Sequence, residues 1–277
     1  MTVGLCWVLC LAAIAEAQAE GEALDPWVGK YCMSLFTKTR TAKTVGKDHW
    51  SVALKVQPFD WDKVRQADGS YADRPAGQSK EQLNSTLCFK YGWAEDHHIA
   101  VGIPYLANDY DLPGKTNDND GLGNIYVFEK WNCVKETNTR PAVAVDLWYY
   151  VPRGNSASAK GLGINDGAYK VTAEVSKAWK AFSLHFNPGY TWGDDDDYEV
   201  GELNGAVILT PTKTLWPAVE YNYYWREGKG HRHDVVPGLI WKFLPSSSFK
   251  VALPITVDSS FTDKEEVGLM FKLFYRH

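Results

Sequence analysis

The densest group of potential metal ligands in the sequence is Asp194 to Asp197, a run of consecutive aspartates. Adjacent carboxylates repel one another, so a chain keeps them together where water or a cation surrounds them. A dedicated Ca²⁺ site needs ligands that converge from fixed spacings, and four neighbouring side chains on a short turn cannot all face one ion. We therefore interpret this run as a solvated turn and predict no metal site.

Ser183 and His185 are the best candidates for nucleophile and base, because residues two apart lie on one face of an extended strand. Such a pair also needs a third group that orients the base. No Gly-x-Ser-x-Gly stretch surrounds Ser183, and His231 and His233 belong to a different segment. We predict no catalytic residues and no cofactor, and keep hydrolysis as an alternative.

Cysteines give no redox or zinc motif, since no C-x-x-C spacing occurs. Removal of an N-terminal leader would leave Cys32, Cys88 and Cys133. One disulfide with a spare thiol and three small buried hydrophobic residues are both compatible with that number.

The elements that must position these groups begin after an apolar N-terminus. Residues 3–15 are apolar and Ala17-Gln18-Ala19 is a small-x-small pattern, which predicts a signal peptide over residues 1–19. The net charge of -5 includes no basic stripe, so we expect no nucleic-acid partner. We divide the exported chain into a periplasmic arm, residues 20–49, and a β-domain, residues 50–277.

From about residue 50 onward, apolar and polar residues alternate with period two, which predicts β-strands. In residues 182–192, for example, one face is wholly apolar and the other is small and polar. Twelve such runs are expected, near residues 50–57, 84–94, 97–105, 122–134, 141–151, 167–178, 180–192, 199–210, 214–226, 232–243, 248–257 and 265–275.

Three features favour a transmembrane barrel over a soluble sandwich. Most runs have roughly ten residues, the length that a tilted strand needs to cross a bilayer. The longest connections, 58–83, 106–121 and 152–166, all fall on one side, as in outer-membrane barrels. Glu266, Gly268, Phe271 and Leu273 also follow the order of a terminal insertion signal read by the barrel-assembly machinery, although Arg276 and His277 come after it.

Several segments between residues 100 and 270 resemble the MetA-pathway of phenol degradation family. These include "NDNDGLGNIYVFEKW", "RPAVAVDLWYYVPRG" and "SLHFNPGYTW". Asn124 and Arg153 depart from the family's usual Asp and Thr. The resemblance implies an antiparallel β-barrel in the outer membrane of a Gram-negative cell that passes small organic, aromatic or hydrophobic, compounds, with no catalytic residues. The matching positions are Gly121, Gly123, Pro152, Gly154, Asn187, Gly189 and Tyr190.

If the apolar faces contact lipid, the opposite faces line the lumen. Charges of both signs there could pair and fill the lumen or line a water path, and twelve strands lie between the ~8 of a filled barrel and the ~16 of an open pore. The lumen-lining candidates are Lys90, Asp146, Lys170, Glu174, His185, Glu202, Glu220, Arg226, Asp234, Lys242, Lys250 and Lys272, together with Lys55.

Outside the lumen, tryptophans near strand ends are expected at headgroup depth, next to lipid and lipopolysaccharide. They are Trp50, Trp93, Trp131, Trp179, Trp192, Trp216 and Trp225. The basic segment 28–49 is expected to be a solvated periplasmic tail, and the alternatives are insertion into the acidic lumen or contact with anionic lipid headgroups.

The predicted function is thus an outer-membrane channel for a small-molecule solute. Two alternatives remain: an outer-membrane lipid-modifying hydrolase, and a soluble exported β-sandwich binding protein.

Overall fold

The computed structural model describes residues 36–193 and 199–277. The expected signal peptide, residues 1–19, and the aspartate run 194–197 lie outside the described residues, as does Cys32. Within them, Cys88 is buried, Cys133 is exposed, and both are free thiols.

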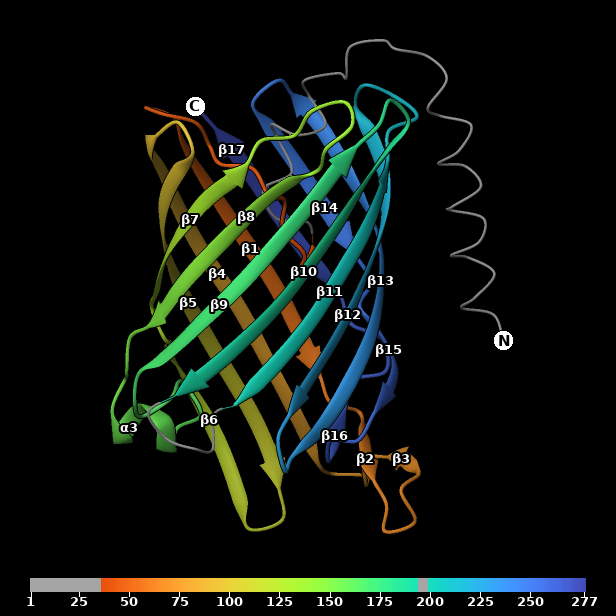
Figure 1. Ribbon diagram of the computed structural model, residues 1–277. Coiled ribbons are helices and arrows are strands. Elements are labelled where there is room, and N and C mark those ends of the chain that lie inside the picture. Colours follow the sequence, from red (N-terminus) through yellow and green to blue (C-terminus); the bar gives the residue numbers. More distant parts are fainter. Residues whose placement is uncertain (1–35, 194–198) are drawn as a thin grey trace.

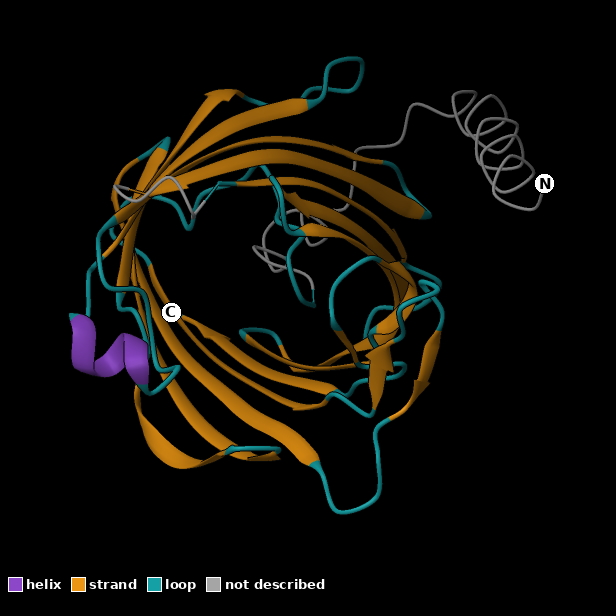
Figure 2. Ribbon diagram, turned by 90° about the horizontal axis from the view of Figure 1, so that it is seen from below, coloured by secondary structure: helices purple, strands orange, loops and turns teal. Residues whose placement is uncertain are grey.

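A single closed antiparallel sheet forms the wall, because the order β12-β11-β10-β9-β8-β7-β5-β4-β1-β17-β14-β13 is closed by pairing of β12 with β13. Figure 2 shows this ring of strands end-on. β14 and β15 act as one strand interrupted at Leu253 and Pro254, so the prediction of twelve strands is confirmed, and the sandwich alternative is wrong. The wall strands are β1 (Trp50–Asp60), β4 (Ser79–Ala94), β5 (His97–Leu112), β7 (Tyr126–Val134), β8 (Ala142–Tyr150), β9 (Ala168–Ala178), β10 (Phe182–Gly193), β11 (Val200–Leu209), β12 (Leu215–Arg226), β13 (Gly230–Leu244), β14 (Ser247–Ala252), β15 (Ile255–Ser259) and β17 (Met270–Arg276).

The two ends of the barrel differ (Figure 1). The short-turn end carries the C-terminus and the connections 95–96, 135–141, 179–181, 210–214 and 245–246. The long-loop end carries helix α3 (Asn155–Ala159), the extension β6 (Lys115–Leu122) and a small sheet of β2 (Lys63–Arg65), β3 (Tyr71–Asp73) and β16 (Asp263–Lys264). The longest connections therefore gather at one end, as expected.

Several strand boundaries differ from the sequence prediction; β4, for example, starts at Ser79 instead of residue 84, and β7 at Tyr126 instead of residue 122. Residues 106–121 were expected to be a loop, but β5 and β6 continue as a hairpin with Pro113 and Gly114 at its tip. This hairpin stands clear of the apolar wall and its strands are mostly polar, so no alternation marks them. The last strand starts at Met270 instead of residue 265, because the preceding segment turns inward, where Asp60 N–H donates to the Glu265 carboxylate.

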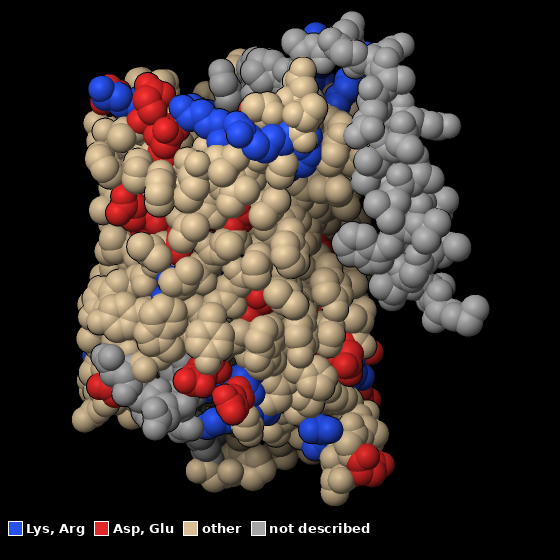
Figure 3. Space-filling model, in the orientation of Figure 1, with Lys and Arg blue, Asp and Glu red and all other residues tan. Residues whose placement is uncertain are grey.

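The barrel is apolar outside and polar inside. Leu147 and Phe186 are 56% and 50% exposed, whereas Glu174 and Glu220 are fully buried. In Figure 3 charged side chains gather toward the two ends, and the band between them is mostly uncharged. An exposed apolar belt around a polar interior is the surface that a bilayer requires. No helix in the described part of the chain is long and apolar enough to cross a membrane.

Aromatic side chains mark the edges of this belt. Trp93, Trp131 and Trp192 are exposed on the outer face, as predicted. Trp216 is an exception, because the alternation along β12 points it into the lumen, where it is only 2% exposed. Its indole N–H donates to Thr212 O, and Lys242 Nζ lies 4.4 Å from the ring centroid.

Candidate functional site

The described part of the N-terminal segment, residues 36–49, corrects the prediction of a solvated periplasmic tail. It enters the lumen at the short-turn end, where Lys43 pairs with Glu136 and Arg276 donates to Val45 O. Phe36, Thr39 and Ala42 are almost completely buried. We call residues 36–43 the arm. The backbone N–H groups of this segment lose their hydrogen bonds to water when they enter the lumen, and carboxylates of the wall replace those bonds.

Glu220 on β12 holds the deepest part of the arm. Its carboxylate accepts hydrogen bonds from the backbone N–H groups of residues 36–39, at 2.6–3.2 Å, and from the Thr37 hydroxyl at 2.7 Å. A carboxylate that accepts several N–H groups forms charge-assisted bonds, which are stronger than neutral ones.

Arg40 attaches the arm to another part of the wall, around β7 and β8. Its guanidinium donates to Asp146 at 2.7 Å and stacks over Phe128 and Trp148, 4.3 and 4.1 Å from the ring centroids. Its backbone N–H donates to Asn187 Oδ1, so the asparagine of the Asn-x-Gly-Tyr element fixes the arm. A charged group stacked on aromatic faces and paired with a buried carboxylate is strongly localised.

The final arm residues, Thr41 and Ala42, are also hydrogen-bonded to the wall. Lys130 Nζ donates to Thr41 O at 2.7 Å and pairs with Glu174. Asn132 donates to Ala42 O, and Ala42 N–H donates to Ser176 Oγ at 2.8 Å. The wall therefore provides partners along the whole arm.

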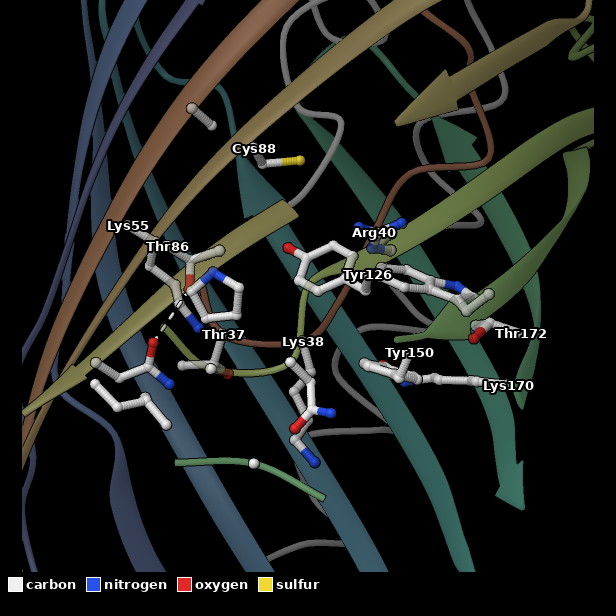
Figure 4. Close-up of a pocket in the computed structure, with 18 of the residues that line it drawn as sticks. Thr37, Lys38, Arg40, Lys55, Thr86, Cys88, Tyr126, Tyr150, Lys170 and Thr172 are labelled. Carbon is white, nitrogen blue, oxygen red and sulfur yellow. Dashed lines mark hydrogen bonds between the residues drawn. The ribbon is translucent and has the colours of Figure 1, made fainter. Parts of the chain in front are cut away.

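Beside the arm and onward toward the long-loop end, the lumen holds a cavity of about 690 Å³. Thr37, Lys38 and Arg40 border it from the arm, and residues 161–164 border it from the loop after α3. Figure 4 shows Lys38 and Arg40 beside wall residues Tyr150 and Lys170. A volume within the range of about 300–1,000 Å³ is typical of small-molecule sites.

Asn124 pins this bordering loop. Its amide donates to Val151 O at 2.8 Å, and its carbonyl accepts Ile164 N–H at 2.7 Å. A Cβ at Gly163 would lie 2.5 Å from that carbonyl oxygen, so only glycine fits there. The Asn that departs from the family's usual Asp thus supplies a donor that an ionised Asp lacks.

The charged lining of the cavity is mostly cationic. Six cations reach it, and the one lining carboxylate among the described residues is Glu202, which pairs with Lys170 at 2.6 Å and Lys38 at 3.3 Å. On the far wall, Lys272 lies near Lys55 and Lys90, whose charges repel its own. The cavity-lining cations are Lys38, Arg40, Lys55, Lys90, Lys170 and Lys272.

Aromatic rings form another part of the cavity wall. Tyr126 lies 5.2 Å from Trp148 and 5.9 Å from Tyr150, centroid to centroid. Phe274 lines the wall beside Lys272 on β17. Rings and ammonium groups on one surface can bind a planar ring by stacking and an acidic substituent by charge.

Most predicted lumen residues lie where the alternation puts them. Lys170 and Arg226 are partly exposed, and the other predicted positions are buried on the inner face: Lys90, Asp146, Glu174, His185, Glu202, Glu220, Asp234, Lys242, Lys250 and Lys272. The cavity brings together Lys90, Lys170, Glu202 and Lys272, whereas Asp146, Glu174 and Glu220 serve the arm.

Sequence reasoning missed Tyr126, Phe128, Lys130 and Trp148 as lumen residues. In β7 and β8 both faces carry aromatics, so alternation alone could not separate them. The available signal was that Lys130 and Asn132 are polar and two residues apart, which places both on the same face of the strand.

Ser183 and His185 do touch, with Ser183 Oγ 2.9 Å from His185 Nε2. The group on His185 Nδ1 is the Ser176 hydroxyl, 2.8 Å away, instead of a carboxylate. All three side chains are buried beneath the arm, since Ser176 also accepts Ala42 N–H. A hydroxyl cannot stabilise an imidazolium as a carboxylate does, so the contact is explained by packing.

Comparison with known proteins gives one family and a set of structures. The model of the MetA-pathway of phenol degradation family matches residues 61–266. No curated protein matches the sequence. The COG4313 outer membrane channel from Pseudomonas putida F1 is similar in fold, with a TM-score of 0.72, 12% identity and coverage of 87% of this chain and 100% of that one. A TodX mutant, a monoaromatic hydrocarbon channel, gives a TM-score of 0.50 at 8% identity, covering 91% and 98%.

Proposed function

This chain belongs to the MetA-pathway of phenol degradation family, and on that premise we propose that it is an outer-membrane channel for small organic solutes. The short-turn end faces the periplasm and the long-loop end faces the cell exterior, because outer-membrane barrels keep their short turns inside. The observation that carries the proposal is the cavity of about 690 Å³, which lies within a lipid-facing barrel.

The lining chemistry supports a solute class. Lys55, Lys90 and Lys272 supply positive charge, and Tyr126 and Trp148 supply ring faces. A single-ring compound with a carboxylate or phenolic oxygen matches both features, since its acidic group can pair with ammonium donors while its ring stacks. Two similar folds are described as an outer membrane channel and a monoaromatic hydrocarbon channel, and the second description supports the single ring of the proposed solute.

The remaining assignments are extensions of this proposal. Residues 1–19 are removed on export, the apolar belt contacts lipid and lipopolysaccharide, and the C-terminal strand β17 is recognised by the barrel-assembly machinery. The lumen-facing side chains contact the solute as it passes, and catalysis has no part in the function.

Reconstitution tests the channel. Purified protein in planar bilayers should produce discrete conductance steps, and benzoate should reduce the current by occupying the cavity. Liposomes containing the protein should accumulate benzoate faster than cyclohexanecarboxylate, which has the same charge but no aromatic ring. Absence of conductance, together with uptake no faster than that of protein-free liposomes, would contradict the proposal.

A further inference from the structure

On the outer surface of the barrel, His231, His233 and Asp258 form a group that the channel proposal does not use. It lies at the long-loop end on β13 and β15, which run side by side in Figure 1. One ligand atom from each residue lies within 4.8 Å of the other two. From this geometry we propose that the group is a binding site for Zn²⁺ or a similar late first-row divalent cation.

The strands build this group by two local rules. His231 and His233 are two residues apart on β13, so both point outward, while Arg232 and Asp234 between and beyond them pair with each other inside. Asp258 would alternate inward with regular register. A register shift between His233 and Asp234 makes Val257 and Asp258 both face outward. Val257 is 55% exposed, and the side chain of Asp258 is 62% exposed. Bulges of this kind re-aim a side chain.

The ligand atoms already point at one another. His231 Nε2 lies 3.2 Å from Asp258 Oδ2, and His233 Nε2 lies 4.0 Å from the same oxygen. Zinc–nitrogen distances of about 2.0–2.1 Å put tetrahedral ligand atoms about 3.3 Å apart. Small side-chain rotations that move the ligand atoms by roughly an ångström therefore complete a three-ligand site, and the fourth position stays open to water.

The other ring nitrogens are also engaged, as expected for metal-binding histidines. The Ser260 hydroxyl lies 3.2 Å from His231 Nδ1, and the Tyr221 hydroxyl contacts His233 Nδ1. Tyr223 stacks on the His233 ring with centroids 4.4 Å apart. Partners on the distal nitrogens fix the ring orientation and leave both Nε2 atoms to the metal. Two imidazoles favour Zn²⁺, Ni²⁺ or Cu²⁺ over Mg²⁺ and Ca²⁺, which prefer all-oxygen sites.

A cation at this position would fasten β15 to β13. β15 pairs with β13 from Ile255 to Ser259, but the register shift interrupts the ladder at Val257. On its other side, the described residues join β15 to the 260–269 connection by one bridge, Ile255 to Val267. The bound metal would therefore raise the resistance of the barrel to unfolding, because it binds the folded state alone.

The test is Zn²⁺ titration of the full-length detergent-solubilised barrel, with excess Mg²⁺ present. The wild type should bind one equivalent more than the double variant His231→Ala, His233→Ala, and Zn²⁺ should raise the unfolding temperature of the wild type only. Asp258→Asn should weaken binding by about tenfold or more, as loss of a carboxylate ligand predicts.

His97→Ala is the matched control. His97 also lies on the outer surface beside a carboxylate, with Nδ1 3.0 Å from Glu129, but at the opposite end and with no second histidine in the group. This variant should bind Zn²⁺ as the wild type does. If the double variant fails to fold, His233→Gln replaces it, because glutamine can still bond to Tyr221. Equal Zn²⁺ binding by wild type and His231/His233 variants, a loss that His97→Ala shares, or no saturable binding by the wild type would each overturn the proposal.

Discussion

Two sides of the lumen wall differ in what faces them. On the side of β8, β9 and β12, Asp146, Glu174 and Glu220 meet cations and backbone N–H groups of the arm. On the side of β17, β1 and β4, the cations Lys272, Lys55 and Lys90 face a cavity. The wall thus separates its charges around the barrel, with acidic groups gathered where a chain segment is bound and basic groups where there is room.

This difference teaches that strand number alone does not decide whether a barrel is open. A barrel of about 8 strands is filled by its own side chains, whereas one of twelve leaves space that something else must fill. Here a segment of the same chain occupies part of it. We therefore expect the arm, and not the wall, to limit the proposed channel.

Deleting residues 36–43 should give the largest effect. The carboxylates that face the arm, Asp146, Glu174 and Glu220, would then face water. Single-channel conductance should rise several-fold over the wild type. Planar-bilayer recording measures the change, and heat-modifiable migration in gels establishes that the variant is folded. An unchanged conductance would show that the arm does not limit the pathway.

Glu220→Gln should have a similar but smaller effect without shortening the chain. The amide keeps one acceptor oxygen but turns an N–H donor toward the backbone N–H groups of residues 36–39, and each buried donor left unsatisfied costs about 1–3 kcal/mol. The recorded current should show frequent brief steps to a higher conductance, each from release of the arm. Glu129→Gln, which changes an exposed carboxylate on the outer face, is the control and should leave the current as it is.

The double substitution Lys55→Gln, Lys90→Gln tests the cation-lined side of the cavity. Removing two cavity cations should lower the anion-to-cation permeability ratio several-fold, because the cavity potential falls. The reversal potential in a KCl gradient measures this ratio. Lys135→Gln removes an exposed cation at the short-turn rim and should not shift it. A ratio unaffected by the double substitution would assign selectivity elsewhere.

The smallest expected effect concerns Glu265 in the connection 260–269. Unlike Glu220, it is buried with one hydrogen bond to its carboxylate among the described residues, from Asp60 N–H, and burial raises its pKa from 4.5 to about 7. Ionisation is therefore less favourable in the folded protein than in the unfolded chain. The resulting stability is complete below the unfolded pKa and is lost as the pH rises from about 4.5 to 7.

Thermal unfolding at several pH values measures this loss. The midpoint of the wild type should fall by roughly a few °C between pH 5 and pH 8 from this group. Glu265→Gln should remove that component and keep the barrel intact. An identical pH profile for the two proteins would mean that Glu265 is well solvated in the folded state.

The sequence by itself determined the wall. Alternation with period two is a local property, since each side chain points to the face opposite its neighbours, so Phe186 outside and Glu220 inside could be predicted without any tertiary contact. Loop lengths likewise predicted which end is which. Local patterns failed where the lipid no longer imposes alternation, as in the β5–β6 hairpin, and where both faces are aromatic, as at Phe128 and Trp148.

Only the tertiary structure decided what lies inside the wall. The arm meets Glu220 across more than 180 residues of chain, and no periodicity relates two segments so far apart. The same holds for the cavity cations, which come from the arm and four different strands, and for Asp258, which a register shift turns outward. Pairing between remote side chains depends on closure of the barrel, because closure is what brings opposite walls within reach of one inserted segment.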